Sequence, residues 1–274
     1  MKQYLELVSR VLRQGTQRED RTGTGTISVF GTQTTFDLRE GFPATTSKRL
    51  AFKAVVGELL GFIKGVDNLN DFDPAGAKIW QANYEAKYWT PRVPGDLGRI
   101  YGVNWRDWQS VTKDGHAKST DQLMVLIKGL KNKPASRRHL VITYNPGELD
   151  QVVLPPCHYA FQCFVENGSL DMIVVMRSLD LFLGMPFDIA SYAILQTMLA
   201  REVGLTPRML TFQCADTHIY MNHIEQVKEM LSRTPTALPQ LAINPNKSFF
   251  ELTMDDFELL NYYPHPTIPA PMAV

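Results

Sequence analysis

The chain lacks the features of secreted, membrane-spanning and disulfide-stapled proteins. Only three of its 274 residues are cysteine, and their spacing is not paired, which argues against a disulfide scaffold and for a reducing compartment. No apolar run approaches the roughly 18 residues that a membrane helix needs. The first residues show no signal pattern, so we expect a cytoplasmic protein that does not enter a membrane.

An excess of one charge is also lacking. Lys and Arg together number 28, as do Asp and Glu, so nothing suggests a basic surface for nucleic acid. No linker rich in proline, glycine and serine divides the chain, and no internal repeat is visible. The hydrophobic content of 44% is enough for a substantial core. We therefore expect a single domain over residues 1–274.

Several segments show clear periodicity. Residues 2–13, 51–64 and 120–131 have the apolar spacing of amphipathic helices. A strand is expected at Ile27–Phe30. Residues 84–99 are rich in proline, glycine and charge, which predicts an excursion at the surface.

The central stretch, residues 154–192, combines two prolines, a cysteine, a hairpin and the start of a helix. Apolar residues alternate on both sides of Asn167-Gly168, a dipeptide that favours a tight hairpin turn. Asp188 stands just before the helical apolar run that starts at Ile189, so we expect it to be an N-cap.

Cys157, which follows Pro155-Pro156, is the leading candidate for covalent chemistry. A thiolate is a strong nucleophile, and nearby arginines are expected to lower the thiol pKa. A lone cysteine is more often an inert small hydrophobe, and we expect that role for Cys163 and Cys214. His158 is not expected to act as a base on its neighbour, because adjacent residues of an extended segment point to opposite sides.

Other polar residues allow two interpretations each. Arg21, in a glycine-rich loop, is either a phosphate clamp or part of a simple turn. Glu58, flanked by leucines, is either a boundary residue or a desolvated carboxyl with a raised pKa suited to proton transfer. The run from Cys214 to His223 holds ligand-type residues, but its spacing matches no common zinc pattern, so we expect no metal.

The order of the motifs resembles that of thymidylate synthases and their relatives, the deoxycytidylate hydroxymethylases and methyltransferases. The matching motifs are DRTGTGT at Arg21, GELLGF at Glu58, KIW at Trp80, Arg137-Arg138, PPCH at Cys157, Arg177-Ser178, the run from Asp216 to Tyr220 and the tail PHPTIPAPMAV. They cover nearly the whole chain. The resemblance implies an α/β (α+β) fold with a large, twisted, mixed sheet packed with helices, and a homodimer interface on the back of the sheet.

The resemblance also implies a role for individual residues. The expected catalytic residues are Cys157, Glu58, Tyr101, Arg177 and Asp216. The base is expected to contact Asp188 and His158, and the sugar His218 and Tyr220. The phosphate is expected to contact Arg21, Arg177 and Ser178, together with Arg137 and Arg138 reaching across from the partner subunit. The co-substrate methylenetetrahydrofolate is expected to contact Lys48, Trp80, Asp180, Leu183, Gly184, Phe187 and Ala273.

Asp188 is the residue that predicts the base. Thymidylate synthases carry Asn there, and an amide matches the N3–H donor and O4 acceptor of uracil. A protonated carboxyl instead donates to N3 of cytosine and accepts from its amino group, whereas a mismatch with uracil costs about 1–3 kcal/mol. Met176 before Arg-Ser agrees, because deoxycytidylate hydroxymethylases also carry it. We predict dCMP as the substrate, with dUMP as the alternative if Asp188 is only a neutral cap. Thymidylate synthases have two glycines where this chain has Cys214-Ala215 beside the expected sugar site, so a ribonucleotide substrate stays an alternative to a deoxyribonucleotide.

The product depends on how the methylene intermediate on C5 of the base is quenched. Hydride from the folate gives a methyl group, and water gives hydroxymethyl, so exclusion of water decides between them. The tail resembles a segment that closes over the site, which favours 5-methyl-dCMP. Asn83, where synthases commonly have a second folate-contacting Trp, favours entry of water. Hydroxymethylation, thymidylate synthesis and an RNA-binding regulator remain the alternatives.

Overall fold

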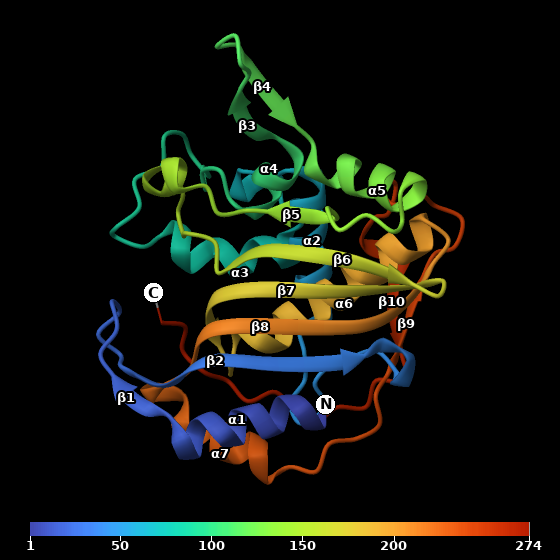
Figure 1. The fold of residues 1–274 in the computed structure, drawn as a ribbon. Coiled ribbons are helices and arrows are strands. Elements are labelled where there is room, and N and C mark those ends of the chain that lie inside the picture. The colour runs from blue at the N-terminus through green and yellow to red at the C-terminus, as the bar shows by residue number, and fades with distance from the viewer. Residues whose placement is uncertain (274) are drawn as a thin grey trace.

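A six-stranded mixed sheet forms the centre of the computed structural model, which describes residues 1–273 (Figure 1). The order is β1-β2-β8-β7-β6-β5. Neighbouring strands are antiparallel except for β7 and β8, which run parallel. The strands are β1 (Thr16–Arg18), β2 (Thr26–Asp37), β5 (Leu140–Ile142), β6 (His158–Glu166), β7 (Ser169–Asp180) and β8 (Thr206–Tyr220). The expected mixed sheet is confirmed.

Helices pack behind this sheet and along its two edges (Figure 1). They are α1 (Lys2–Gln14), α2 (Phe52–Lys64), α3 (Pro74–Tyr84), α4 (Tyr101–Arg106), α5 (Gln122–Asn132), α6 (Gly184–Glu202) and α7 (Ile224–Ser232). Two separate hairpins pair β3 (Trp108–Val111) with β4 (Ala117–Thr120), and β9 (Gln240–Ile243) with β10 (Phe257–Leu260). Short 3₁₀ turns occupy Leu38–Glu40, Leu69–Asp71, Pro146–Gln151, Met221–His223 and Met254–Asp256. The three expected helices are confirmed as α1, α2 and α5.

Helix α6 forms the crossover that joins the parallel strands β7 and β8. The sheet covers one side of it and α2 lies against another, so α6 is buried around most of its circumference. Its apolar residues join one contiguous core between the sheet and the helices. This packing fixes the start of α6 against the ends of β7 and β8.

The predicted hairpin is confirmed. Strand β6 ends at Glu166 and β7 begins at Ser169, so Asn167 and Gly168 form a two-residue turn. Their φ angles are 49° and 74°, as a type I′ turn requires. At the other end of β6, the register shifts by one residue between His158 and Ala160, and this bulge sets the direction of the chain beside Cys157.

The predicted N-cap at Asp188 is wrong. Helix α6 begins one turn earlier, at Gly184, after Leu183 as its N-cap, and no side chain caps it. Pro186 is tolerated there because the first turn of a helix leaves its N–H groups unpaired in any case. Asp188 therefore lies inside the helix, and its carboxyl is not used for capping.

The strand expected at Ile27–Phe30 is confirmed as part of the longer β2, which pairs with β8. The surface excursion expected at residues 84–99 needs correction. Residues 84–99 contain no regular helix or strand beyond the end of α3, but they do not all lie at the surface. Leu97 is fully buried, and the carboxylate of Asp96 accepts hydrogen bonds from Arg92 and from the N–H of Gly98.

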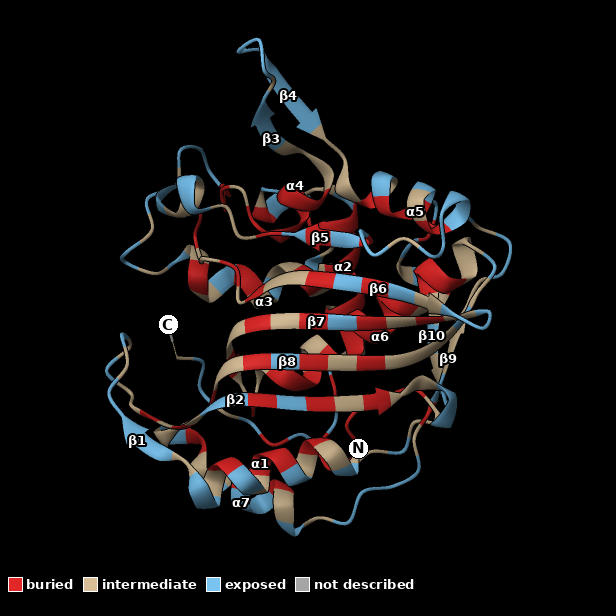
Figure 2. Cartoon of the chain, in the orientation of Figure 1, coloured by how far each residue is buried: buried red, intermediate tan, exposed pale blue. Residues whose placement is uncertain are grey.

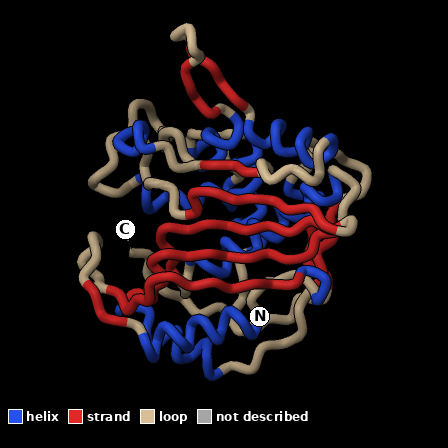
Figure 3. The backbone as a smooth tube through the Cα atoms, viewed as in Figure 1, coloured by secondary structure: helices blue, strands red, loops and turns tan. Residues whose placement is uncertain are grey.

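The sheet face opposite the helices is uncovered by the described residues, as Figures 2 and 3 show. Large apolar side chains are exposed on its strands, namely Phe30, Leu140, Ile142, Phe164 and Ile173. Within residues 1–273, no helix has the length and apolar character to cross a membrane.

Candidate active site

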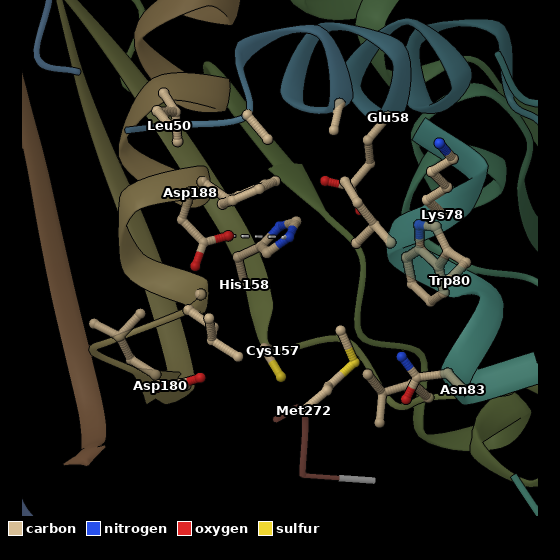
Figure 4. Close-up of a pocket in the computed structure, with 18 of the residues that line it drawn as sticks. Leu50, Glu58, Lys78, Trp80, Asn83, Cys157, His158, Asp180, Asp188 and Met272 are labelled. Carbon is tan, nitrogen blue, oxygen red and sulfur yellow. Dashed lines mark ion pairs between the residues drawn. The ribbon is translucent and has the colours of Figure 1, made fainter. Parts of the chain in front are cut away.

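A cavity of about 930 Å³ lies where β7 and β8 end and β6 begins. Helices α2, α3 and α6 and the C-terminal residues complete its wall (Figure 4). This size is at the upper end for a small-molecule site. The structure brings most of the predicted residues together here: Arg21, Glu58, Trp80, Tyr101, Cys157, His158, Arg177, Ser178, Asp180, Leu183, Gly184, Phe187, Asp188, His218, Tyr220 and Ala273.

Cys157 is positioned by Tyr101 through its backbone and by Arg177 beside its thiol. The Tyr101 hydroxyl accepts a hydrogen bond from the backbone N–H of Cys157 at 2.8 Å. The Arg177 guanidinium lies 3.6 Å from its Sγ, and it also donates to the carbonyls of Pro155 and Pro156 at 2.6 and 2.9 Å. The two prolines thus turn their carbonyls toward the arginine, which fixes its distance from the sulfur.

The expectation of a lowered thiol pKa at Cys157 is not met in the free chain. Burial raises the pKa of Cys157, and the nearby Arg177 charge offsets only part of that rise. Cys163 and Cys214 behave as the sequence predicts for inert residues, because they are buried and burial raises the pKa of each to about 12.

His158 faces the cavity as a neutral ring. Burial lowers its pKa to about 3, and it stacks on Tyr101 with ring centroids 3.9 Å apart. Its Nδ1 lies 2.7 Å from the Tyr192 hydroxyl, and its Nε2 lies 3.9 Å from a carboxylate oxygen of Asp188 (Figure 4). His158 does not contact Cys157 as a base would, and instead forms one polar wall with Asp188.

Three carboxyls face the same space from different elements. Burial raises the pKa of Glu58, on α2, to about 8, and the charge of Asp188 adds to that rise. Burial also raises the pKa of Asp188 to about 7, with a further contribution from Asp180 at the end of β7. Glu58 is therefore mostly protonated at neutral pH, and Asp188 is close to half protonated. Groups of this kind can donate or accept a proton without a large cost.

Arg21 reaches the cavity from a loop that its own side chains organise. The Asp20 carboxylate accepts hydrogen bonds from the N–H groups of Thr22 and Gly25, at 3.0 and 2.8 Å. Gly23 and Gly25 have φ angles of 72° and 75°, which favour glycine. Arg21, Arg177 and Ser178 together present donors suited to an anionic group.

Two predicted phosphate residues lie elsewhere in this chain. Arg137 and Arg138 are exposed, just before β5, and do not line the cavity. The sequence predicts that they contact the phosphate bound by the partner subunit, and this stays a prediction.

Strand β8 places His218 and Tyr220 on one face, as predicted from their spacing. The Nδ1 of His218 lies 3.1 Å from Asp216, while its buried Nε2 has no hydrogen-bond partner among residues 1–273. A neutral ring that donates Nδ1–H to Asp216 offers Nε2 as an acceptor for a ligand hydroxyl.

The catalytic role expected for Asp216 needs correction. Its side chain does not line the cavity, and it pairs instead with His218 and with Arg18 at 3.1 Å. Asp216 shares its face of β8 with His218 and Tyr220, but it lies two residues earlier along the strand, outside the cavity lining. In this chain its carboxylate contacts the cavity only through the ring of His218.

Lys48 was expected to contact the folate, and it is not a lining residue. Its ammonium donates to the carbonyl of Phe182 at 2.7 Å and lies 4.0 Å from that ring centre. Burial lowers its pKa to about 8. Lys48 thus supports the segment before α6 from behind, because the chain turns so that Arg49 rather than Lys48 points toward the cavity.

The sequence reasoning missed a set of cations at the cavity. These residues are Arg49, Lys53 and Lys78. Lys53 and Lys78 lie on two amphipathic helices, where single lysines are normally solvated. Their positions in the sequence therefore did not indicate a binding site. Only the packing of α2 against α3 brings them to one cavity.

The model of the thymidylate synthase family matches residues 2–274. The chain belongs to the thymidylate synthase family. A protein of Escherichia phage T5 described as a probable thymidylate synthase is 46% identical over 287 aligned residues, which span the whole of both chains. The protein is therefore a one-carbon transferase of this family, whose members act on a nucleotide and use methylenetetrahydrofolate as co-substrate.

The cavity fits the two ligands of a thymidylate synthase. The indole N–H of Trp80 faces the carboxyl of Glu58, and Leu183 and Phe187 add an apolar wall beside the ring, which suits a flat ring with polar edges. No group of three or more His, Cys, Asp or Glu residues within residues 1–273 is arranged to hold a metal ion.

Proposed function

We propose that this enzyme transfers a one-carbon unit to C5 of dCMP and releases 5-methyl-dCMP. The observation that carries this proposal is the carboxyl of Asp188, which faces the cavity beside His158 and has a pKa of about 7. Because Asp188 lies inside α6, helix capping gives no other reason for an acid at this position.

The protonated carboxyl matches cytosine in both of its hydrogen bonds. It donates to N3 and accepts from the amino group at C4, whereas uracil presents the opposite pattern. The neighbouring Asp180 charge and the buried setting both favour the protonated form of Asp188.

The surrounding side chains supply the covalent step. The thiolate of Cys157 adds to C6 of the base, which makes C5 nucleophilic enough to attack the one-carbon unit. Arg177, beside the sulfur, stabilises the thiolate, and the phosphate of the nucleotide extends toward Arg21 and Ser178. Glu58, protonated at neutral pH, exchanges protons with the base and the folate.

Two observations bear on the alternatives. The name of the phage T5 relative favours dUMP as the substrate. Asn83, buried on α3 at the cavity, adds a polar group where an aromatic side chain would exclude water, which favours a hydroxymethyl product. Against this, Met272 and Ala273 line the cavity, as expected of a tail that closes it, so we place methylation first.

The substrate and the product are tested in one assay. dCMP and dUMP are supplied separately with methylenetetrahydrofolate, and product mass is read together with dihydrofolate absorbance. We expect dCMP to gain a methyl group and an equal amount of dihydrofolate to appear. Hydroxymethyl without dihydrofolate would support the base but not the product, and turnover of dUMP alone would contradict the substrate.

The proposal includes a homodimer built on the open sheet face. Phe164 and Ile173 are exposed there on the neighbouring strands β6 and β7, Phe30 is exposed on β2 beyond β8, and a second copy would cover them. Arg137 and Arg138 would then be available to the phosphate bound by the partner subunit.

A further inference from the structure

The residues after β10 form a strap along the cavity, defined here as residues 261–273. Its first part is held by the N–H of His265, which donates to the Thr46 carbonyl at 2.8 Å, and by Arg233, which donates to the Pro266 carbonyl at 2.6 Å. Its last described residues, Met272 and Ala273, line the cavity with Cys157 (Figure 4). Val274, the final residue of the predicted closing tail, lies outside the described residues.

His223 holds this strap at the residue just before the cavity. It ends the 3₁₀ turn Met221–His223 and is fully buried. Its Nε2 lies 2.7 Å from the carbonyl oxygen of Pro271. The ring lies 5.6 Å from that of Tyr220, a predicted sugar contact, and 5.5 Å from that of Phe182, in the segment before α6. One side chain thus joins the strap to two walls of the site.

The contact defines the protonation of the ring. A carbonyl oxygen can only accept a hydrogen bond, so Nε2 of His223 carries the proton. Nδ1 is buried and has no hydrogen-bond partner among residues 1–273. Breaking the bond to Pro271 would leave a buried N–H donor unpaired as well, which makes the attached position of the strap the favoured one.

We propose that His223 is a positioning residue that holds the strap closed and thereby directs the reaction toward a methyl product. The inference rests on the proposed function for its consequence, though not for the contact itself. With the strap attached, Met272 and Ala273 occupy the side of the cavity nearest the chain end, where water would otherwise enter.

The consequence follows from the two ways of quenching the methylene on C5. Hydride from C6 of tetrahydrofolate adds to the methylene carbon, and the C6–S bond of the nucleotide breaks with its electron pair returning to the sulfur of Cys157. The folate also loses the proton on its N5 and leaves as dihydrofolate. In the other route, water adds its oxygen to the same carbon, loses a proton to solvent, and the same bond breaks while the folate stays reduced. A looser strap shifts the ratio toward the second route.

The test compares two variants of His223 in the full chain. His223→Phe keeps a ring between Tyr220 and Phe182 but removes the donor, whereas His223→Gln keeps an N–H that can still reach the carbonyl. The first readout is the rate at which iodoacetamide alkylates Cys157 in the free enzyme. It is specific, because the other two cysteines are buried. The second readout is the amount of dihydrofolate formed for each nucleotide consumed.

We expect His223→Phe to raise the alkylation rate about fivefold to tenfold, the factor that loss of one net hydrogen bond produces, and to lower the dihydrofolate ratio. His223→Gln should stay close to the wild type in both. Unchanged alkylation and an unchanged ratio in His223→Phe would overturn the proposal.

A matched control separates the effect of losing the bond between His223 and Pro271 from general destabilisation of the fold. The ring of His139 is also buried, and its Nε2 lies 3.1 Å from the carbonyl oxygen of Lys133, far from the strap in sequence. If His139→Leu shifts the dihydrofolate ratio as much as His223→Phe does, the proposal fails. If the wild type converts neither nucleotide, the proposed function fails, while the alkylation rates still decide whether His223 closes the strap.

The wild-type chain offers a test that does not depend on a variant folding. The nitrogen chemical shifts of the imidazole rings report which nitrogen carries the proton. We expect the Nε2–H tautomer at His223, as the bond to Pro271 requires, and finding the proton on Nδ1 would overturn the proposal.

Discussion

At the scale of single residues, the chemistry depends on where burial places a few ionisable groups. Burial raises the pKa of Glu58 and of Asp188, with a further rise from the charge of Asp188 at Glu58 and from the charge of Asp180 at Asp188, while burial alone keeps His158 neutral. The pKa values of about 8 and about 7 span the working range of a proton relay. Because the groups interact, a change at one is expected to be felt at its neighbour.

Replacement of Asp188 tests the base. We expect Asp188→Asn to move the preference in kcat/KM from dCMP toward dUMP by about tenfold to a hundredfold, because the amide now matches uracil. The measurement is kcat/KM for both nucleotides in the wild type and the variant. Asp180→Asn is the comparison, since it changes a nearby charge without changing the group that faces the base.

The same carboxyl predicts a pH dependence. The protonated form of Asp188 pairs with cytosine, and its pKa is about 7, so kcat/KM for dCMP should fall as the pH rises above 7. Asp188→Asn has no group that titrates at this position, so its kcat/KM profile for dUMP should not show this fall above pH 7. If kcat/KM for dCMP stays constant from about pH 6 to about pH 9, the protonated carboxyl of Asp188 does not pair with cytosine.

Glu58 makes a prediction about stability. Its pKa is raised to about 8 in the folded chain. Its contribution to the free energy of unfolding is therefore complete below the ordinary carboxyl pKa and is lost as the pH rises toward 8. We expect Tm of the wild type to fall over this range more steeply than that of Glu58→Gln. Glu225→Gln, at a side chain that is 81% exposed, is the matched control and should follow the wild type.

At the scale of elements, β8 shows how a strand builds a site with a supporting layer. Its alternation sends His218 and Tyr220 to the cavity, and Asp216, two residues earlier on the same face, contacts the ring of His218 from outside the cavity. The same strand pairs with β2 on one side and β7 on the other, so its end is fixed in position.

Removing the support should weaken nucleotide binding. We expect Asp216→Ala to raise the KM for the nucleotide about tenfold, because His218 loses the acceptor that holds its Nδ1–H, and to leave the KM for the folate unchanged. Asp216→Asn keeps an acceptor and should restore most of the loss. Arg18→Ala removes only the ion pair to Asp216, so an equal effect there would point to the charge pair instead of the histidine.

At the scale of the whole molecule, the helices cover one face of the sheet, and the described residues leave the other face open. The exposed apolar side chains and the two arginines before β5 are the features of the chain that its own fold does not use. A homodimer would use both.

Subunit mixing tests this arrangement. Cys157→Ala lacks the nucleophile, and the double variant Arg137→Ala/Arg138→Ala lacks the predicted partner contacts, so each alone should be nearly inactive. After unfolding and refolding together, mixed dimers hold one intact site, and we expect about a quarter of the wild-type activity to return. No recovery, with dimers present by sedimentation, would contradict the shared site.

The sequence by itself determined the local structure and the chemical content of the site. Asn167-Gly168 set the hairpin, because its backbone conformation is a local property. The family motifs identified Cys157, Glu58 and His218, since a motif records which residue types the reaction needs.

Tertiary structure decided which groups meet and in what state of charge. The packing of α6 against the sheet, not its capping pattern, put Asp188 in the cavity, and burial, which no motif encodes, raised the pKa of Cys157 despite Arg177. Whether Lys48 or Arg49 lines the cavity was likewise decided by how the chain turns between packed elements. Desolvation and long-range contact depend on residues distant in the sequence, so only the folded chain could settle them.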